Sequence, residues 1–306
     1  MAWPVAVVGV GKIARDQHLP AIAGDPDFVL AAGVSRQETL AGVPNFKDID
    51  AFLKDGPEAA VALCVPPSVR TAMAVKALEA GRDVLLEKPP AATLGAVERM
   101  TAAAAANGRV LFATWHSRFA PCVPAAKAWL AGRKVARAAI VWKEDVRRWH
   151  PGQAWIWQPS GFGVFDPGIN ALSILTEILP GAFVVDRATL SFPENCATPI
   201  AAEVAMTGAE GCPVTMDLDW RQEGPQTWDI TVETDAGTLG LSLGGAAMAV
   251  DGAEVERGPD REYPAIYRRF GALLAARESD VDAAPLRICA DAFLLGERRF
   301  VAPFHD

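Results

Sequence analysis

The sequence predicts an α/β protein with two domains, because its two parts carry different hydrophobic patterns. In the first 115 residues, short apolar runs alternate with helical segments, which is typical of a parallel sheet covered by helices on both faces. After residue 115, alternating segments follow one another with few helices between them, which favours a largely antiparallel sheet. We expect a doubly wound parallel-sheet domain over residues 1–117 and an α+β domain with an open sheet over residues 118–306.

The first part predicts five strands and three helices. The strands follow the apolar runs Val5–Val10, Phe28–Val34, Val61–Val65, Val84–Leu86 and Val110–Thr114. The helices follow helical spacing of apolar side chains at Lys12–Ala23, Val69–Ala80 and Leu94–Asn107. Gly81 and Gly108 end the last two, since glycine is favoured just past a helix C-terminus. In the first helix, Ile13, Leu19 and Ile22 are the candidate core contacts.

The second part predicts six strands and four helices. Alternating segments predict strands at Ala136–Val146, Val184–Phe192, Ile200–Thr207, Val214–Trp220, Trp228–Thr234 and Thr238–Leu243. Helices are expected at Pro121–Gly132, Asp166–Leu179, Ala265–Ala276 and Ala283–Arg299. The last two can belong to the second domain or return to the first.

Composition excludes several classes of protein. The net charge of -8 argues against non-specific nucleic-acid binding. No apolar run reaches the length of about 18 residues that a membrane span needs. The apolar N-terminus lacks a basic region and leads into a glycine motif, so it is interpreted as a strand and not as a signal peptide, and a cytoplasmic protein is expected. Five scattered cysteines and four histidines without metal-site spacing indicate no metal.

A glycine loop lies between the first strand and the first helix. Gly9-Val10-Gly11-Lys12-Ile13-Ala14 fits the G-x-G-x-x-G/A pattern of a Rossmann dinucleotide site. Gly9 permits the tight turn, Gly11 lets the backbone approach a pyrophosphate, and Ala14 allows close packing of helix on strand. The alternative is an ordinary turn between strand and helix.

The end of the second strand predicts the cofactor. An NAD site usually has an acidic residue there, about 20 residues after the glycines, to bind the ribose 2′-hydroxyl. The sequence has Ser35-Arg36 instead, and a hydroxyl beside a guanidinium suits a 2′-phosphate. We therefore expect NADP to be preferred and NAD tolerated. Alternatively, Arg36 is a solvated loop charge or stacks on the adenine of either cofactor.

Three later segments complete a family pattern: Cys64-Val65-Pro66-Pro67, Glu87-Lys88-Pro89-Pro90, and Gly161-Phe162-Gly163-Val164-Phe165-Asp166-Pro167-Gly168-Ile169-Asn170. In this order after the glycine loop, and over nearly the whole chain, they resemble the Gfo/Idh/MocA oxidoreductases. The resemblance implies a Rossmann domain, an open-sheet substrate domain, and pairing of exposed sheets into a dimer or larger oligomer. It also implies cofactor contacts from Gly9, Gly11, Lys12, Ile13, Ser35, Arg36, Cys64, Pro66, Glu87 and Lys88. Within the family, three features look similar to the bacterial aldose 1-dehydrogenases, which act on L-arabinose and D-galactose: the segment Trp115-His116-Ser117-Arg118, the tryptophan-rich stretch, and Asn170.

The family's usual histidine is Asn170 in this sequence, and an asparagine cannot act as a general base near neutral pH. The proton chemistry is therefore expected at Lys88 or Asp166, with Asn170 beside them. Lys88 lies at the C-terminal end of a parallel strand, where open α/β sheets bind ligands, and the alternative is a surface lysine after a strand. Asp166 and Asn170 lie four residues apart on one helix face and can grip vicinal hydroxyls. Asp166 can also be an N-cap, since Pro167 follows it.

Further substrate contacts are expected from residues around the second sheet. His116 follows the last strand of the first part, with Arg118 next to it, but a lone histidine is often structural. Glu144 shares strand parity with Ile140 and Trp142, and a charge on an apolar face needs a partner or a ligand.

Tryptophans are unusually frequent, nine in all. Their faces suit the C–H faces of a sugar, although tryptophans in a sheet are more often core or interface. Trp149 follows the strand that carries Glu144, and Trp228 shares parity with Ile230 and Val232, so these two are the candidate sugar contacts.

The glycine loop together with the resemblance to aldose 1-dehydrogenases implies an NAD(P)-dependent oxidation of an aldose at C1 to its lactone. The alternatives are oxidation at another carbon of a polyol such as an inositol, and a non-catalytic NADP-binding regulator on the same scaffold. An intact Lys88 argues against the regulator.

Replacing Arg36 by alanine tests the cofactor assignment. Loss of a charge-assisted hydrogen bond costs roughly 1.5–3 kcal/mol, so the KM for NADP should rise about ten- to a hundred-fold while the KM for NAD changes little. The measurement is steady-state kinetics with each cofactor. A wild-type protein that binds NAD at least as tightly as NADP would refute the assignment.

Overall fold

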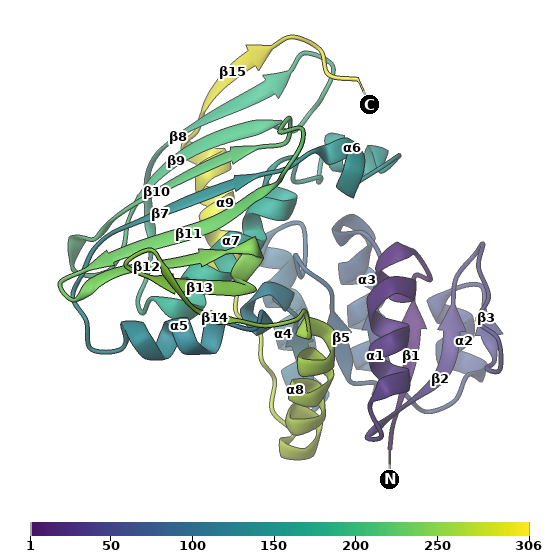
Figure 1. Cartoon of the computed structure of the whole chain (residues 1–306). Helices are drawn as coiled ribbons and strands as arrows, with labels where there is room; N and C mark the ends of the chain where they lie inside the picture. Colours follow the sequence, from purple (N-terminus) through teal and green to yellow (C-terminus); the bar gives the residue numbers. More distant parts are fainter. Residues whose placement is uncertain (1, 306) are drawn as a thin grey trace. The chain divides into compact units, whose positions relative to one another are not determined.

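The computed structural model describes residues 2–305 and divides the chain into two compact units, each built on one sheet (Figure 1). Unit 1 comprises residues 1–116 and 262–283, and unit 2 comprises residues 117–261 and 284–306. Of the two C-terminal helices, only α8 (Glu262–Ala276) belongs to unit 1, whereas α9 (Ala284–Leu295) belongs to unit 2. Within residues 2–305, no helix is long and apolar enough to cross a membrane.

Unit 1 contains a six-stranded parallel sheet in the order β3-β2-β1-β4-β5-β6, which is the doubly wound order of a Rossmann domain. The strands are β1 (Trp3–Val8), β2 (Phe28–Val34), β3 (Asn45–Phe46), β4 (Ala60–Leu63), β5 (Val84–Leu86) and β6 (Leu111–Ala113). The helices are α1 (Leu19–Gly24), α2 (Ile49–Asp55), α3 (Pro67–Glu79) and α4 (Leu94–Ala106). The predicted fold class is confirmed, and β3 and α2 are the additions.

The first helical stretch contains a π-helical turn at Ala14–His18 that runs into α1. Its buried face comprises Ala14, His18, Ala21 and Ile22. The prediction that Ile13 is a core contact is wrong, because its side chain lies in the first turn and remains 36% exposed. The histidine that replaces it in the core was not singled out by the sequence.

Unit 2 contains a nine-stranded mixed sheet in the order β14-β13-β12-β11-β7-β10-β9-β8-β15. The pairs β7–β10 and β8–β15 are parallel and the other pairs are antiparallel, so the sheet is largely antiparallel as predicted. The strands are β7 (Val135–Lys143), β8 (Val184–Pro193), β9 (Ala201–Thr207), β10 (Pro213–Asp219), β11 (Thr227–Thr234), β12 (Gly237–Ser242), β13 (Ala247–Val250), β14 (Ala253–Arg257) and β15 (Glu297–Val301).

Helix α7 (Phe165–Ile178) is buried along most of its length and contacts β7, β11, α9 and α5 (Val123–Leu130). The predicted helix 283–299 is too long, because it stops at Leu295 and the chain continues as β15. This edge strand pairs in parallel with Thr189–Pro193 of β8. Its charged sequence carries no strand signal, so only pairing with a distant segment defines it.

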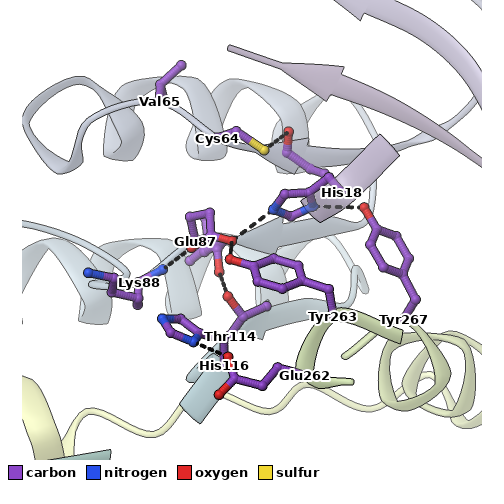
Figure 2. Close-up of polar contacts among 12 residues, drawn as sticks. His18, Cys64, Val65, Glu87, Lys88, Thr114, His116, Glu262, Tyr263 and Tyr267 are labelled. Atoms are coloured by element: carbon purple, nitrogen blue, oxygen red, sulfur yellow. Dashed lines mark hydrogen bonds and ion pairs between the residues drawn. The ribbon is translucent and has the colours of Figure 1, made fainter. Parts of the chain in front are cut away.

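Within unit 1, α8 is fixed by aromatic packing and by a buried polar network (Figure 2). Phe270 is fully buried and stacks on Phe28 of β2, with 6.2 Å between the ring centroids. The Tyr267 hydroxyl lies 2.9 Å from His18 Nδ1, and His18 Nε2 lies 2.8 Å from Glu87 Oε1. The Tyr263 hydroxyl donates to the same Glu87 oxygen at 2.7 Å. Segments more than 170 residues apart in sequence therefore meet at one carboxylate.

The charges of this network support one another. Burial alone would lower the pKa of His18, but the neighbouring Cys64 sulfur, the Tyr267 oxygen and the Glu87 carboxylate raise it well above its ordinary value. Burial alone would raise the pKa of Glu87, but the hydrogen bond and charge of His18, with the Tyr263 hydroxyl, lower it to about 2. Glu87 is therefore an anion and His18 a cation at neutral pH, and both are buried.

The network makes stability depend on pH in a defined direction. Unfolded histidine has a pKa of about 6.5, so above that pH the folded protein holds a proton on His18 that the unfolded chain releases. The contribution of His18 is complete below pH about 6.5 and is lost as the pH rises through its raised folded pKa. The contribution of Glu87 has the opposite sense: it is present above about pH 4.3 and is lost as the pH falls towards about 2.

We therefore expect the free energy of unfolding to fall between pH 6.5 and pH 9, as measured by urea unfolding at several pH values. The double variant His18→Phe, Glu87→Gln removes both titrating groups and should show a smaller decline. Replacing the exposed His305 by phenylalanine is the matched control and should keep the wild-type decline. An equally steep decline in the double variant would contradict the assignment of charge to this pair.

Candidate active site

The glycine loop of unit 1 has the geometry of a phosphate-binding turn. Gly9 has φ of +88°, and a Cβ there would lie 2.7 Å from Val65 Cγ1 and 2.9 Å from the Cys64 carbonyl oxygen, so only glycine fits. A Cβ on Gly11 would meet nothing within 4 Å, which leaves its backbone open to close approach. Ala14 is fully buried against the sheet.

The start of the following helix completes this turn. The Arg15 N–H donates to the Gly11 carbonyl (3.1 Å), so the N–H groups before it point out of the helix start, where an anion is favoured. Lys12 pairs with Asp16, and both are exposed. Ile13 leaves an apolar side chain exposed beside the loop. These residues fit a dinucleotide: glycines for the close approach, N–H groups for the pyrophosphate, and an apolar contact.

The loop after β2 is organised by Ser35, whose Oγ accepts the backbone N–H groups of Gln37 (3.4 Å) and Glu38 (3.3 Å). Arg36 is exposed in this loop. Glu38 is a carboxylate that the sequence analysis did not consider, and it pairs with Arg15 at 2.6 Å. The structure thus brings two arginines to the loop and neutralises the nearby carboxylate with one of them.

Lys88 follows β5, half-buried, between the buried residues Glu87 and Pro89. The predicted cofactor contact of Glu87 stays a prediction, and the contacts that the structure shows for its carboxylate are with the protein. The carboxylate is only 4% exposed, and it accepts from His18 Nε2, the Tyr263 hydroxyl and the Lys88 N–H (3.0 Å) (Figure 2). An ionised carboxylate with three protein donors in the interior is satisfied by the protein itself.

The segment after β4 lies beside the same backbone. Cys64 is half-buried and Pro66 is exposed as the residue that precedes α3. Arg70 of α3 is 3% exposed and donates to the Val65 carbonyl at 2.5 Å and to the carbonyl oxygens of Glu87 and Pro89. Sequence analysis did not select Arg70, because an arginine at a helical position usually faces solvent.

His116 ends the first segment of unit 1. Its Nδ1 lies 2.5 Å from Glu262 Oε2, and its ring stacks on Tyr263 at 6.0 Å. Burial alone would lower the pKa of His116, but the Glu262 carboxylate raises it. The predicted substrate contact of this histidine stays a prediction, and its visible role is to connect to α8.

Unit 2 carries a second buried carboxylate, Glu144. It directly follows β7 and continues the ladder, because its N–H donates to the Asp219 carbonyl at 2.9 Å. Its side chain is 4% exposed on the inner face, as the alternation predicted. Its two oxygens accept the indole N–H groups of Trp220 (3.2 Å) and Trp228 (2.8 Å).

The aromatic residues around Glu144 form a wall. Trp228 lies opposite Trp142 in the β7–β11 register and stacks on it at 6.1 Å. Trp149 at the end of α6 (Val146–Trp149) lies against Trp228 at 5.2 Å and keeps 37% of its surface exposed. The three predicted sugar contacts of this region, Glu144, Trp149 and Trp228, are therefore brought together, and Trp220 joins them.

His150 joins the same cluster and was missed by the sequence analysis, which weighed it only as a metal ligand. Its Nε2 lies 3.6 Å from Asp166 Oδ2 and 3.9 Å from Glu144 Oε1. Its ring also contacts Trp220 at 5.2 Å. No sequence spacing signals this, because the three polar residues come from separate segments. Within residues 2–305 there is no group of three His, Cys, Asp or Glu side chains that could hold a metal ion.

Asp166 and Asn170 lie one turn apart at the start of α7. The N-cap of this helix is Val164, so the alternative of Asp166 as N-cap is wrong. Asp166 lies in the first turn, 3% exposed, where the helix dipole favours its negative charge, and Asn170 is half-buried. Arg118 donates to the Ser173 carbonyl of the same helix at 3.0 Å, so the structure places it in helix packing.

Comparison with known proteins agrees with the fold described above. Residues 4–114 match the Gfo/Idh/MocA oxidoreductase family, described as having an NAD-binding Rossmann fold. A galactose 1-dehydrogenase of Pseudomonas fluorescens is 44% identical, over 99% of this chain and 98% of that protein. A crystal structure of a D-galactose-1-dehydrogenase protein from Rhizobium etli is 53% identical, with a TM-score of 0.95 over 99% of this chain and 98% of that one.

More distant structures share the fold alone. A 3-ketoreductase from Actinomadura kijaniata, solved with NADP, has a TM-score of 0.83 at 18% identity, over 98% of this chain and 100% of that one. The WlbA dehydrogenase from Bordetella pertussis, solved with NADH, has a TM-score of 0.82 at 19% identity, over 96% of both chains. Because the match to the galactose 1-dehydrogenase spans nearly the full length of both proteins, and the glycine loop and Glu87-Lys88-Pro89 lie within the matched Rossmann region, the chain belongs to the Gfo/Idh/MocA family of oxidoreductases.

Proposed function

We propose that the protein is an aldose 1-dehydrogenase that oxidises C1 of a cyclic sugar of the D-galactose or L-arabinose type to the lactone. The observation that carries the proposal is the cluster in unit 2, where an indole wall adjoins the carboxylates of Glu144 and Asp166. The two relatives described as galactose 1-dehydrogenases support it, since each matches this chain over nearly its full length.

The cluster has the chemistry that a sugar requires. A pyranose presents C–H groups on its faces, which suit the exposed ring of Trp149, and hydroxyl groups at its rim. Each Glu144 oxygen accepts one indole N–H, and a carboxylate oxygen can accept more than one hydrogen bond. The amide of Asn170 can donate and accept in the same hydrogen-bonding pattern.

The proton of the C1 hydroxyl needs an acceptor in the protein. Bound NADP, with NAD as a weaker substitute, supplies the hydride acceptor. Asp166 is one candidate for the proton, because His150 lies 3.6 Å from its carboxylate and can stabilise either of its protonation states. An imidazole from a separate segment thus supports the carboxylate, where the family usually has a histidine at the position of Asn170. Lys88 is the other candidate.

The position of oxidation is tested with methylated substrates. Free D-galactose and L-arabinose should reduce NADP, whereas their 1-O-methyl glycosides should not, because they have no C1 hydroxyl proton to lose. Product analysis should find a lactone that opens slowly to the aldonic acid. A methyl glycoside that turns over as fast as the free sugar would show oxidation at another carbon, and no turnover of any sugar or polyol would favour a cofactor-binding regulator.

The proton acceptor is tested by three variants compared at saturating cofactor. Lys88→Met should lower kcat by roughly 10²- to 10⁴-fold if Lys88 takes the proton, with little change in the Kd for NADP. Asp166→Asn should cause that loss instead if the acid is the acceptor. Asn170→Ala removes a neutral hydrogen bond and should cost only about 0.5–1.5 kcal/mol. Near-normal kcat in both Lys88→Met and Asp166→Asn, with circular dichroism confirming the fold, would refute both assignments.

A further inference from the structure

We propose that Arg70 and Glu87 are positioning residues that hold the backbone of Lys88 from both sides and so orient its amine. This inference rests on the proposed function in one respect, namely that Lys88 takes part in the chemistry. Neither side chain is required to touch substrate or cofactor.

Glu87 holds the N–H side of the lysine. Its Oε2 accepts the Lys88 N–H at 3.0 Å, while Oε1 accepts from His18 and Tyr263. Because the carboxylate is fixed at its other oxygen by two buried groups, it cannot rotate away from the Lys88 N–H without breaking both bonds. The carboxylate therefore determines where the Lys88 Cα lies.

Arg70 holds the carbonyl side. Its Nη1 donates to the carbonyl oxygens of Glu87 and Pro89, which flank Lys88, and its Nη2 donates to the Val65 carbonyl at 2.5 Å. The planar guanidinium presents these donors in a fixed fork, which a lysine ammonium cannot reproduce. The same side chain thus joins the loop after β4 to the Lys88 segment.

The free-energy cost of burying these charged groups indicates that they have a role besides stabilising the fold. Glu87, His18 and Arg70 are each at most 4% exposed, and burying charged groups is expensive even when they are paired. Apolar residues of similar volume often stabilise a core equally well. The charged groups converge on three consecutive backbone units, and Lys88 is the only residue of that stretch whose side chain is not buried. We infer that the buried charges of Glu87, His18 and Arg70 serve to position Lys88.

The test compares Glu87→Gln and Arg70→Lys with the control Arg133→Lys. Arg133 is also a partly buried arginine that donates to a backbone carbonyl, that of Trp129, but it lies in unit 2. A misplacement of about 1 Å can cost about 10²-fold in rate, so we expect kcat to fall roughly 10- to 100-fold in both test variants. The KM for the sugar and the Kd for NADP should stay within about threefold of wild type, and the control should keep its kcat.

Two results would overturn the proposal. One is a kcat within threefold of wild type in folded Glu87→Gln and Arg70→Lys. The other is a loss that lies wholly in the Kd for NADP, which would make Glu87 the cofactor contact that the sequence suggested. If neither variant folds, Tyr263→Phe decides, because it removes a single hydroxyl that bonds Glu87, with Tyr267→Phe as the matched change one bond further away. Tyr263→Phe should lower kcat more than Tyr267→Phe. Equal kcat values would refute the proposal that Arg70 and Glu87 position Lys88.

A readout without substrate separates this inference from the proposed function. Acetic anhydride acetylates lysine amines, and peptide mass spectrometry measures the rate at Lys88. This rate depends on the position and surroundings of the Lys88 amine. Glu87→Gln and Arg70→Lys should change this rate relative to an exposed lysine such as Lys54, whereas Arg133→Lys should not. An unchanged modification rate refutes the positioning role of Arg70 and Glu87, even if the enzyme is active. A changed modification rate in a protein that oxidises no aldose supports the positioning role and refutes the proposed function.

Discussion

The packing of unit 1 depends on the hydrogen bonds that the buried Glu87 carboxylate accepts. It receives an imidazole from the helix that opens at the glycine loop, a phenol from α8, and the N–H of Lys88. An unpaired charge at this depth would be costly, so each of the three partners contributes to the stability of the fold. The chain leaves unit 1 after His116 and returns to it with α8 at Glu262. The carboxylate links that helix to His18 and to the backbone of Lys88.

Unit 2 also contains a buried carboxylate that is satisfied by hydrogen bonds, but its partners differ. Glu144 is buried at the end of β7 and is satisfied by two indole N–H groups, so a carboxylate again sets the position of aromatic side chains. Rigid indoles lose little entropy when they bind a ligand, because their carboxylate partner already fixes them. The partly exposed ring of Trp149 packs on Trp228, so contacts within the protein form the wall.

The surroundings of Asp166 show how the proposed site can accommodate a departure from the family motif. Asn170 cannot carry a proton, yet an imidazole lies beside Asp166 because α6 places His150 there. A carboxylate near an imidazole has the same local chemistry whichever segment supplies the ring. A sequence motif gives positions along one helix, whereas the neighbours of a side chain depend on distances in space, and His150 is a neighbour of Asp166 that the motif does not include.

The sequence by itself determined the fold class, the order of most elements and the glycine loop, because these follow from local hydrophobic period and from the steric freedom of Gly9. It also selected Glu144 and Trp228 by strand alternation, which fixes the face of each strand side chain, and Trp149 because it follows the strand that carries Glu144. It did not reveal β15, whose charged residues become a strand only by pairing with β8. Nor did it reveal Arg70, His18 or His150, or the inward turn of Glu87. Each of these depends on partners supplied by distant segments. Burial of a charge has no local sequence signature, because only the tertiary structure brings together the groups that offset its desolvation.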